Sequence, residues 1–376
     1  MRSPICEILG IEFPLLAFSH CRDVVAAVSR AGGMGVFGAV RHTPEELREE
    51  LAWIDAHCGG RPYGVDLIVP NRIAGKGEAF DGDRLIAALP EEHRSFVAGL
   101  LSARGIDTGD LDDRRADRLR FARNLDAGGA EEILDVAFSF PIRLIANALG
   151  VPPRAMLERG KAAGVPVAAL VGAKEHALAQ IAAGVDILVA AGGEAGGHCG
   201  EVSTMVLVPE VVSVAGDTPV LAAGGIVTGG QMAAAMAMGA AGAWCGSVWL
   251  TTAEGEPDPV IKEKMLAAAS RDTVRSRSRT GKPSRQLRST WTDAWEAAGA
   301  PEPLPMPLQS LLSEPALGKV AALAQGGHDG ARDLATYWVG QGVGLMTQTM
   351  SAGAVVQQFK ADFVAAVERL NGLLEG

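Results

Sequence analysis

The sequence predicts an α/β fold, a (β/α)8 barrel, and three observations lead to this prediction. Short apolar runs recur along the chain, helical patterns separate most of them, and glycine-rich polar segments directly follow several runs. The eight runs cover residues 15–17, 35–38, 64–69, 143–146, 167–171, 185–190, 219–222 and 243–246. An open doubly wound sheet is the main rival, because it shows the same alternation of strands and helices.

Helix signals between the runs support the alternation. Thr43 is followed by Pro44, Glu45 and Glu46, the pattern of a capped helix start, so we expect a helix over 43–57. A second helix is expected over 173–183, because Gly184 supplies a stop signal.

Two segments are longer than the usual connections within a compact domain. The first contains a charged helical stretch at 112–124, and the second contains an arginine-rich run at 275–279 and a proline-rich run at 301–305. Recurring Leu, Ile and Phe argue against disorder in the first segment. The predicted divisions of the chain are the beginning of the barrel over 1–71, a helical insertion or cap over 72–141 after strand 3, the rest of the barrel over 142–270, a C-terminal excursion over 271–335, and a segment over 336–376 that returns to the barrel.

The composition limits the function classes. The chain has 376 residues with 48% hydrophobic content, a net charge of -10 and a pI near 5.3, which argues against nucleic acid or a membrane as main partner. No apolar stretch reaches the ~20 residues of a membrane span. The five cysteines form no CxxC pair and no zinc-site spacing, so we expect no metal. An odd cysteine count without a signal peptide fits a reducing cytoplasm.

Small residues follow two consecutive runs about one βα unit apart. They are Gly224-Gly225 and Gly246-Ser247, which the barrel prediction places after strands seven and eight. Loops at these two places commonly bind phosphate through backbone amides and a helix N-terminus. The alternative is that each glycine only makes a tight turn, but the pair in register favours a phosphate site.

One histidine stands among the glycine-rich segments. His198 lies between Gly197 and Gly200, so we expect an exposed, mobile position. Since an imidazole titrates near pH ~6.5, it suits acid–base chemistry, and we assign it a catalytic or cofactor-proximal role. Glu194 either orients His198 or caps the loop, and both interpretations stay open.

Several motifs together carry a family resemblance. They are residues 194–200, 207–209, 219–226, 239–240 and 246–247, with 31–35, 280–285 and 340–345 as further matches. This set resembles the nitronate monooxygenase family, formerly called 2-nitropropane dioxygenases. The resemblance covers most of the chain outside 72–140.

The resemblance implies an FMN-dependent barrel that oxidises a small-molecule substrate, an alkyl nitronate, with dioxygen to a carbonyl compound and nitrite. It implies that the FMN phosphate lies on Gly224, Gly225, Gly246 and Ser247, and that His198 is the active-site histidine. The other implied cofactor contacts are Ala17, Phe18, Asp66, Gly193, Gly197 and Ala223.

The chain departs from the family pattern at three positions. His20 adds a second imidazole in or beside the cavity, Asp66 stands where many relatives have Asn, and Leu170 stands where some have Lys. An anionic nitronate is less favoured beside Asp66 unless that carboxyl is protonated or turned away.

Two other functions remain open. Relatives on the same scaffold reduce enoyl thioesters or quinones with NAD(P)H, and the run Arg275–Arg279 could hold the phosphate of CoA or a carrier protein, or be a solvated loop. A flavin-binding protein without turnover is the other alternative. We also consider Phe18 and Trp338 for the cavity walls, and the helix over 355–374 for a homodimer.

Overall fold

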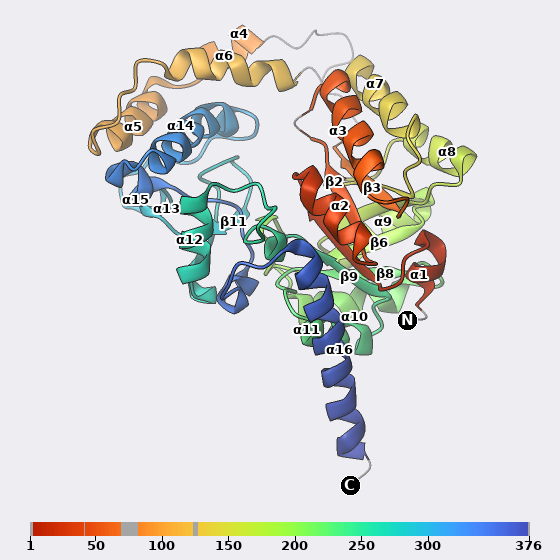
Figure 1. Ribbon diagram of the computed structural model, residues 1–376. Helices are drawn as coiled ribbons and strands as arrows, with labels where there is room; N and C mark the ends of the chain where they lie inside the picture. Colours follow the sequence, from red (N-terminus) through yellow and green to blue (C-terminus); the bar gives the residue numbers. More distant parts are fainter. Residues whose placement is uncertain (1–2, 41, 69–81, 123–126, 375–376) are drawn as a thin grey trace.

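The centre of the molecule is a closed barrel, which confirms the predicted fold class (Figure 1). The computed structural model describes residues 3–40, 42–68, 82–122 and 127–374. The barrel strands all run parallel, and β1 pairs with both β2 and β9, which closes the sheet. The strands are β1 (Leu15–Ser19), β2 (Met34–Gly38), β3 (Tyr63–Leu67), β4 (Leu144–Asn147), β5 (Val167–Val171), β6 (Ile187–Ala191), β8 (Val220–Ala223) and β9 (Gly242–Cys245).

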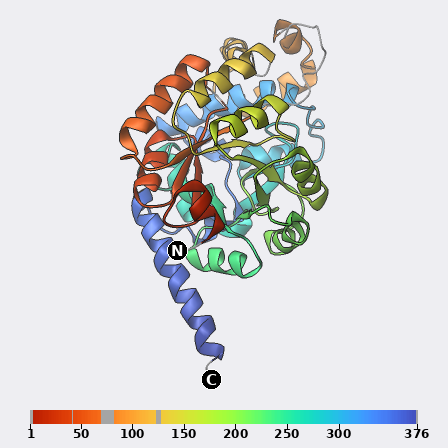
Figure 2. The same cartoon turned by 90° about the vertical axis from the view of Figure 1, so that its right-hand side faces the viewer.

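Helices cover the outside of the barrel (Figure 2). The predicted start of α3 is a complete capping box, since Thr43 accepts from the Glu46 amide and the Glu46 carboxylate accepts from the Thr43 amide. Gly184 ends α9 with φ 88°, a left-handed conformation that favours glycine. The outer helices are α2 (Arg22–Arg30), α3 (Pro44–His57), α7 (Ala127–Phe138), α8 (Arg154–Ala163), α9 (Lys174–Ala183), α10 (Thr204–Ala215), α11 (Gly229–Ala237) and α16 (Ala352–Leu374).

The barrel interior is a packed core. Alternate residues of the strands, such as Leu16, Val36 and Ile187, point inward and are fully buried. Helix α1 (Pro4–Leu9) adds Ile5 and Leu9 to the same cluster, so it covers one end of the barrel. The opposite end, where the strands finish, is left for the site.

A helical unit beside the barrel joins the two long segments (Figure 1). Helices α4, α5 and α6 pack on α14 of the C-terminal excursion, whereas α7 packs on α3 of the barrel. We propose that 82–122 and the excursion form one subdomain. Its elements are α4 (Gly82–Ala87), α5 (Glu91–Ser102), α6 (Leu111–Ala122), α12 (Pro259–Ala267), α13 (Thr290–Glu296), α14 (Leu308–Gln325), α15 (Asp329–Leu334) and the short helices η2 (Ser247–Trp249), η3 (Ser270–Asp272) and η4 (Gln341–Leu345) nearby.

A small antiparallel sheet connects this unit to the barrel. Its strand order is β10 (Thr273–Ser276), β11 (Ser284–Leu287) and β7 (Gly197–His198). The turn between β10 and β11 is fixed by a buried ion pair, because Arg279 binds Glu314 of α14 through two hydrogen bonds of 2.8 and 2.9 Å. The guanidinium also stacks on Trp338, 3.8 Å from the ring centroid.

Helix α16 closes the outer layer and then extends away from the body (Figures 1 and 2). Its first turns pack on α11 and α2 and bury Val355, Val356 and Phe359. Its last turns expose apolar side chains, among them Leu370 and Leu373. The homodimer through this helix stays a prediction. Within the described residues, no helix combines the length and apolarity that crossing a membrane requires.

The contact between α11 and α16 yields a stability prediction. A Cβ at Gly229 would lie 1.9 Å from the Phe359 carbonyl oxygen and 2.6 Å from the Phe363 nitrogen, so the two helices cannot keep their spacing with any larger residue. We expect Gly229→Ala to destabilise the protein by about 1–3 kcal/mol, measured by urea unfolding. Gly230→Ala is the matched control, since its Cβ would meet nothing closer than 4.0 Å. Equal stability of the two variants would contradict the prediction.

Candidate active site

Three segments converge beyond the strand ends of the barrel. They are the loop after β6, the β10–β11 hairpin, and the segment 339–341. The Gln341 amide donates to the Glu194 carbonyl at 2.9 Å, and the Gly340 amide donates to Ser247 Oγ at 2.8 Å. A Cβ on Gly196 would lie 2.8 Å from the Gly340 nitrogen, so the close approach requires glycine. Segment 339–341 therefore ties the loop after β6 to the loop after β9.

His198 is held in a β ladder. It is exposed, as expected, but its backbone pairs with Ser284, and Gly197 pairs with Arg285. The expectation of a mobile position is therefore wrong, because β11 fixes this part of the loop. The ring nitrogen Nε2 lies 2.8 Å from Thr280 Oγ1 in the same hairpin.

The surroundings keep His198 neutral. The ring meets solvent on one side, but the protein packed around the loop desolvates it and lowers its pKa. The nearby cations Lys282 and Arg279 lower the pKa further, and Glu314 opposes them. At neutral pH the imidazole is therefore uncharged, and the positive charge beside it comes from the cations of the hairpin.

Glu194 caps the loop. Its Oε2 accepts from the Thr204 amide at 2.8 Å and from Thr204 Oγ1 at 2.9 Å, at the start of α10. Thr204 Oγ1 also lies 2.9 Å from the Gly224 carbonyl oxygen. Of the two interpretations, these contacts support capping, and they link the loop after β6 to the loop after β8.

The glycines predicted to bind phosphate form a crowded backbone turn. Gly224 and Gly225 have φ of 102° and 71°, which other residues rarely adopt. A Cβ on Gly224 would lie 2.8 Å from Thr204 Oγ1. Among the loops that the structure describes, the amides of Gly225 and Ser247 donate to no backbone acceptor. Ser247 Oγ accepts from Gly340, so its own proton is left to donate.

Asp66 is a buried acid on the inner side of β3. It is 1% exposed, and Oδ1 has no hydrogen-bond partner among the described residues. It stands in register between Gly38 and Ala146. Burial raises its pKa to about 7, so about half of the carboxyl is protonated at neutral pH and most of it at lower pH.

Phe18 lies across the top of the barrel. A Cβ on Gly38 would be 2.8 Å from its ring, and a Cβ on Gly246 would be 3.9 Å from it. His20 packs edge-on against Phe18, and its Nδ1 lies 2.6 Å from the Gly38 carbonyl oxygen.

The other residues predicted to contact the cofactor differ in which of their atoms can reach a ligand. Ala223 belongs to the inner cluster, so its position faces the barrel axis. Ala17 lies in the outer cluster under the helices, so only its backbone can reach a ligand. Gly193 uses its amide on the Val202 carbonyl and its carbonyl on Arg285.

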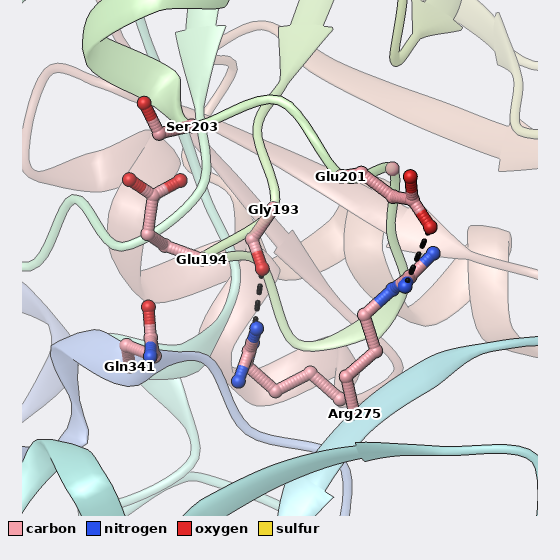
Figure 3. Close-up of a pocket in the computed structure, with 8 residues that line it drawn as sticks. Gly193, Glu194, Glu201, Ser203, Arg275 and Gln341 are labelled. Atoms are coloured by element: carbon pink, nitrogen blue, oxygen red, sulfur yellow. Dashed lines mark hydrogen bonds and ion pairs between the residues drawn. The ribbon is translucent and has the colours of Figure 1, made fainter.

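A pocket of about 330 Å³ lies between the loop after β6 and the hairpin (Figure 3). Arg275 pairs with Glu201 at 3.1 Å, and Arg285 Nε donates to the Gly193 carbonyl at 2.9 Å. Ser203 and Gln341 also line it. Glu201 balances the charge of Arg275, whose Nε has no hydrogen-bond partner among the described residues, and Arg285 is held by a backbone carbonyl.

The arginine-rich run is not a free basic patch. Arg277 pairs with Glu302, and Arg279 is buried against Glu314. From the sequence, a phosphate site and a solvated loop are the alternatives. In the structure, Arg275 lies in β10 and the other two arginines lie in the turn after it, and all three are paired with carboxylates. No group of acidic, His or Cys side chains suited to a metal occurs in the described residues.

Two residues contribute to the site without a local signal in the sequence. Thr280 lies within the matching segment 280–285, but the resemblance gives this residue no role. Thr204 lies outside all of the matching segments. Thr280 and His198 are 82 residues apart, so no local pattern could have paired them, whereas Thr204 lies only 10 residues from Glu194.

Comparisons with known proteins agree with this architecture. The model of the nitronate monooxygenase family matches residues 2–362. Rv1533 of Mycobacterium tuberculosis, provisionally described as a monooxygenase, is 53% identical over 377 residues and 100% of each chain is covered.

Solved structures give the same result. A nitroalkane oxidase from Streptomyces ansochromogenes is 26% identical with a TM-score of 0.78, covering 97% of this chain and 99% of that one. FabK from Thermotoga maritima is 26% identical with a TM-score of 0.72, covering 99% of both chains. Because the family model spans almost the whole chain and the barrel is the same, this protein belongs to the nitronate monooxygenase family and is a flavin-dependent oxidoreductase.

Proposed function

We propose that this protein binds FMN and oxidises an alkyl nitronate with dioxygen to a carbonyl compound and nitrite. The observation that carries the proposal is the setting of His198, a neutral imidazole held by Thr280 beside Lys282 and Arg279. Positive charge around the imidazole favours an anionic substrate such as a nitronate.

The residues present fit the phosphate of FMN. Donors for an anion are available, because among the described residues the amides of Gly225 and Ser247 donate to no backbone acceptor and the Ser247 hydroxyl keeps its proton. Room for the anion comes from Gly224 and Gly246, which have no side chains. The unpartnered Oδ1 of Asp66 and the ring of Phe18 offer a polar and an apolar contact at the top of the barrel. When bound, FMN supplies the redox chemistry with dioxygen.

The protein's own residues attract and orient the substrate. Lys282 provides positive potential near His198, whereas the charge of Arg279 is balanced by Glu314. The imidazole can take a proton from solvent and offer it as an N–H hydrogen bond to the nitronate oxygens. Asp66 would repel a nitronate only when ionised, and its raised pKa reduces that repulsion.

The arginines at 275–279 give little support to the alternative function, an NAD(P)H-dependent reductase that acts on an enoyl thioester. Arg277 is paired with Glu302, Arg279 with Glu314 and Arg275 with Glu201, so a CoA phosphate would have to compete with these carboxylates. The structural similarity to FabK still favours testing NADH and NADPH as reductants.

Anaerobic mixing tests the substrate. We expect propionate 3-nitronate alone to bleach the oxidised flavin band of the purified protein, and NADH or NADPH alone to leave it unchanged. The absorbance spectrum is the measurement. Bleaching by a pyridine nucleotide alone would refute the proposal in favour of a reductase, and bleaching by none of them would favour a flavin-binding protein without turnover.

The role of His198 is tested by His198→Asn. We expect nitronate turnover to fall by about 10–10²-fold with flavin content unchanged, because the hydrogen bond from the imidazole to the anionic substrate is lost while the backbone pairing with β11 remains. Steady-state kinetics and flavin absorbance measure the two quantities. His176→Asn, on the exposed face of α9, is the control. Loss of flavin without a specific loss of turnover would assign His198 a structural role.

The raised pKa of Asp66 makes the free energy of unfolding depend on pH. Its pKa is about 7 in the folded protein against an ordinary 3.8, so the unfolded chain ionises first as pH rises and the folded state loses stability up to about pH 7. Asp66→Asn removes this loss. We expect the variant's stability relative to wild type to grow by roughly 2–3 kcal/mol between pH 5 and pH 8 in urea unfolding. A difference independent of pH would mean that Asp66 titrates normally.

A further inference from the structure

The hydrogen bonds of the Thr280 hydroxyl bear on which nitrogen of His198 carries the proton. Thr280 is 5% exposed, and its Oγ1 lies 2.8 Å from His198 Nε2. The same oxygen accepts from the Lys282 amide at 3.3 Å and lies 3.3 Å from the Lys282 carbonyl oxygen, to which it can donate. The hydroxyl has one proton for two possible acceptors, Nε2 and the carbonyl.

The two arrangements leave different groups unsatisfied. If the hydroxyl donates to Nε2, the Lys282 carbonyl loses its hydrogen bond from Thr280. If the hydroxyl donates to that carbonyl, Nε2 carries a proton and donates to Oγ1, so the ring N–H, the amide and the carbonyl are all satisfied. Buried polar groups favour the arrangement with more hydrogen bonds.

Both ends of this contact are fixed. The His198 backbone pairs with Ser284, and the turn that carries Thr280 is held by the buried pair of Arg279 with Glu314. The other ring nitrogen, Nδ1, has no partner among the described residues, and the side chain is exposed.

We propose that Thr280 is a positioning residue that holds His198 as the Nε2-protonated tautomer, so that Nδ1 is the atom that takes a proton from solvent and offers it, as an N–H hydrogen bond, to the anionic substrate. The inference rests on the proposed role of His198 in turnover. The charged groups around the ring are Lys282 and Arg279 of the hairpin and Glu314 of α14. They set how readily Nδ1 takes a proton, and Thr280 sets which nitrogen is available.

The direct test is the tautomer itself. Nitrogen-15 NMR of histidine-labelled, flavin-loaded protein without substrate, with His198→Asn to assign the signals, is expected to show Nε2–H and an unprotonated Nδ1 at pH 8. A spectrum with Nδ1–H would overturn the proposal. Because no turnover is measured, this result is independent of whether a nitronate is the substrate.

Variants of Thr280 test the consequence. Thr280→Val keeps the shape but removes the acceptor, so we expect a mixture of tautomers, a His198 pKa lower than in wild type, and a kcat about 10-fold lower with KM changed less. Thr280→Ser is expected to restore the wild-type tautomer and pH profile. Flavin content and circular dichroism check that Thr280→Val is folded.

Two outcomes separate the inference from the proposed function. An unchanged tautomer and pH profile in folded Thr280→Val would refute the positioning role even if nitronate turnover is high. The expected tautomer together with absent nitronate turnover would retain the positioning role and refute the proposed substrate.

Discussion

The pairing of β7 with β11 is the constraint on which the site depends. A single short ladder places His198 against the β10–β11 hairpin, which follows the last barrel strand. The hairpin residue that contacts the imidazole, Thr280, is 82 residues away in the sequence. The hairpin is itself fixed by Arg279 and Glu314, and α14 that carries Glu314 is packed by α5 and α6. Since removing one partner of a buried ion pair is costly, the helical unit acts as a rigid support for one imidazole.

Close backbone approach is the second condition of the site. Gly196, Gly224 and Gly340 stand where a Cβ would collide with a neighbouring segment, and the hydrogen bonds of Glu194 and Ser247 cross these contacts. The loops after β6, β8 and β9 are therefore one connected structure. Side chains are absent at Gly224 and Gly246, where we propose that the FMN phosphate binds, and Lys282 and Arg279 lie on the hairpin.

The barrel was predictable because its signals are local. Each strand is an apolar run, α3 begins with its own capping residues, and Gly224 and Gly225 mark a turn that only glycine adopts. The fixed position of His198 and the packing of α4–α6 on α14 were not predictable, because each depends on contacts between distant segments. For Glu194 the sequence left capping and orienting as alternatives, and only the contact with Thr204 supports capping. Asp66 is unusual already in the sequence, but its lack of a partner and its raised pKa follow from burial alone.

The position of α16 in the chain has a consequence for biosynthesis. This helix packs on α11 and α2, over the seam where β9 meets β1, and it is translated after every barrel strand. While the ribosome is still making the chain, the surface of α11 that receives Phe359 stays uncovered. The outer layer over this seam can therefore be completed only after α16 has been translated, so the last helix made is also one that the barrel's first and last strands share.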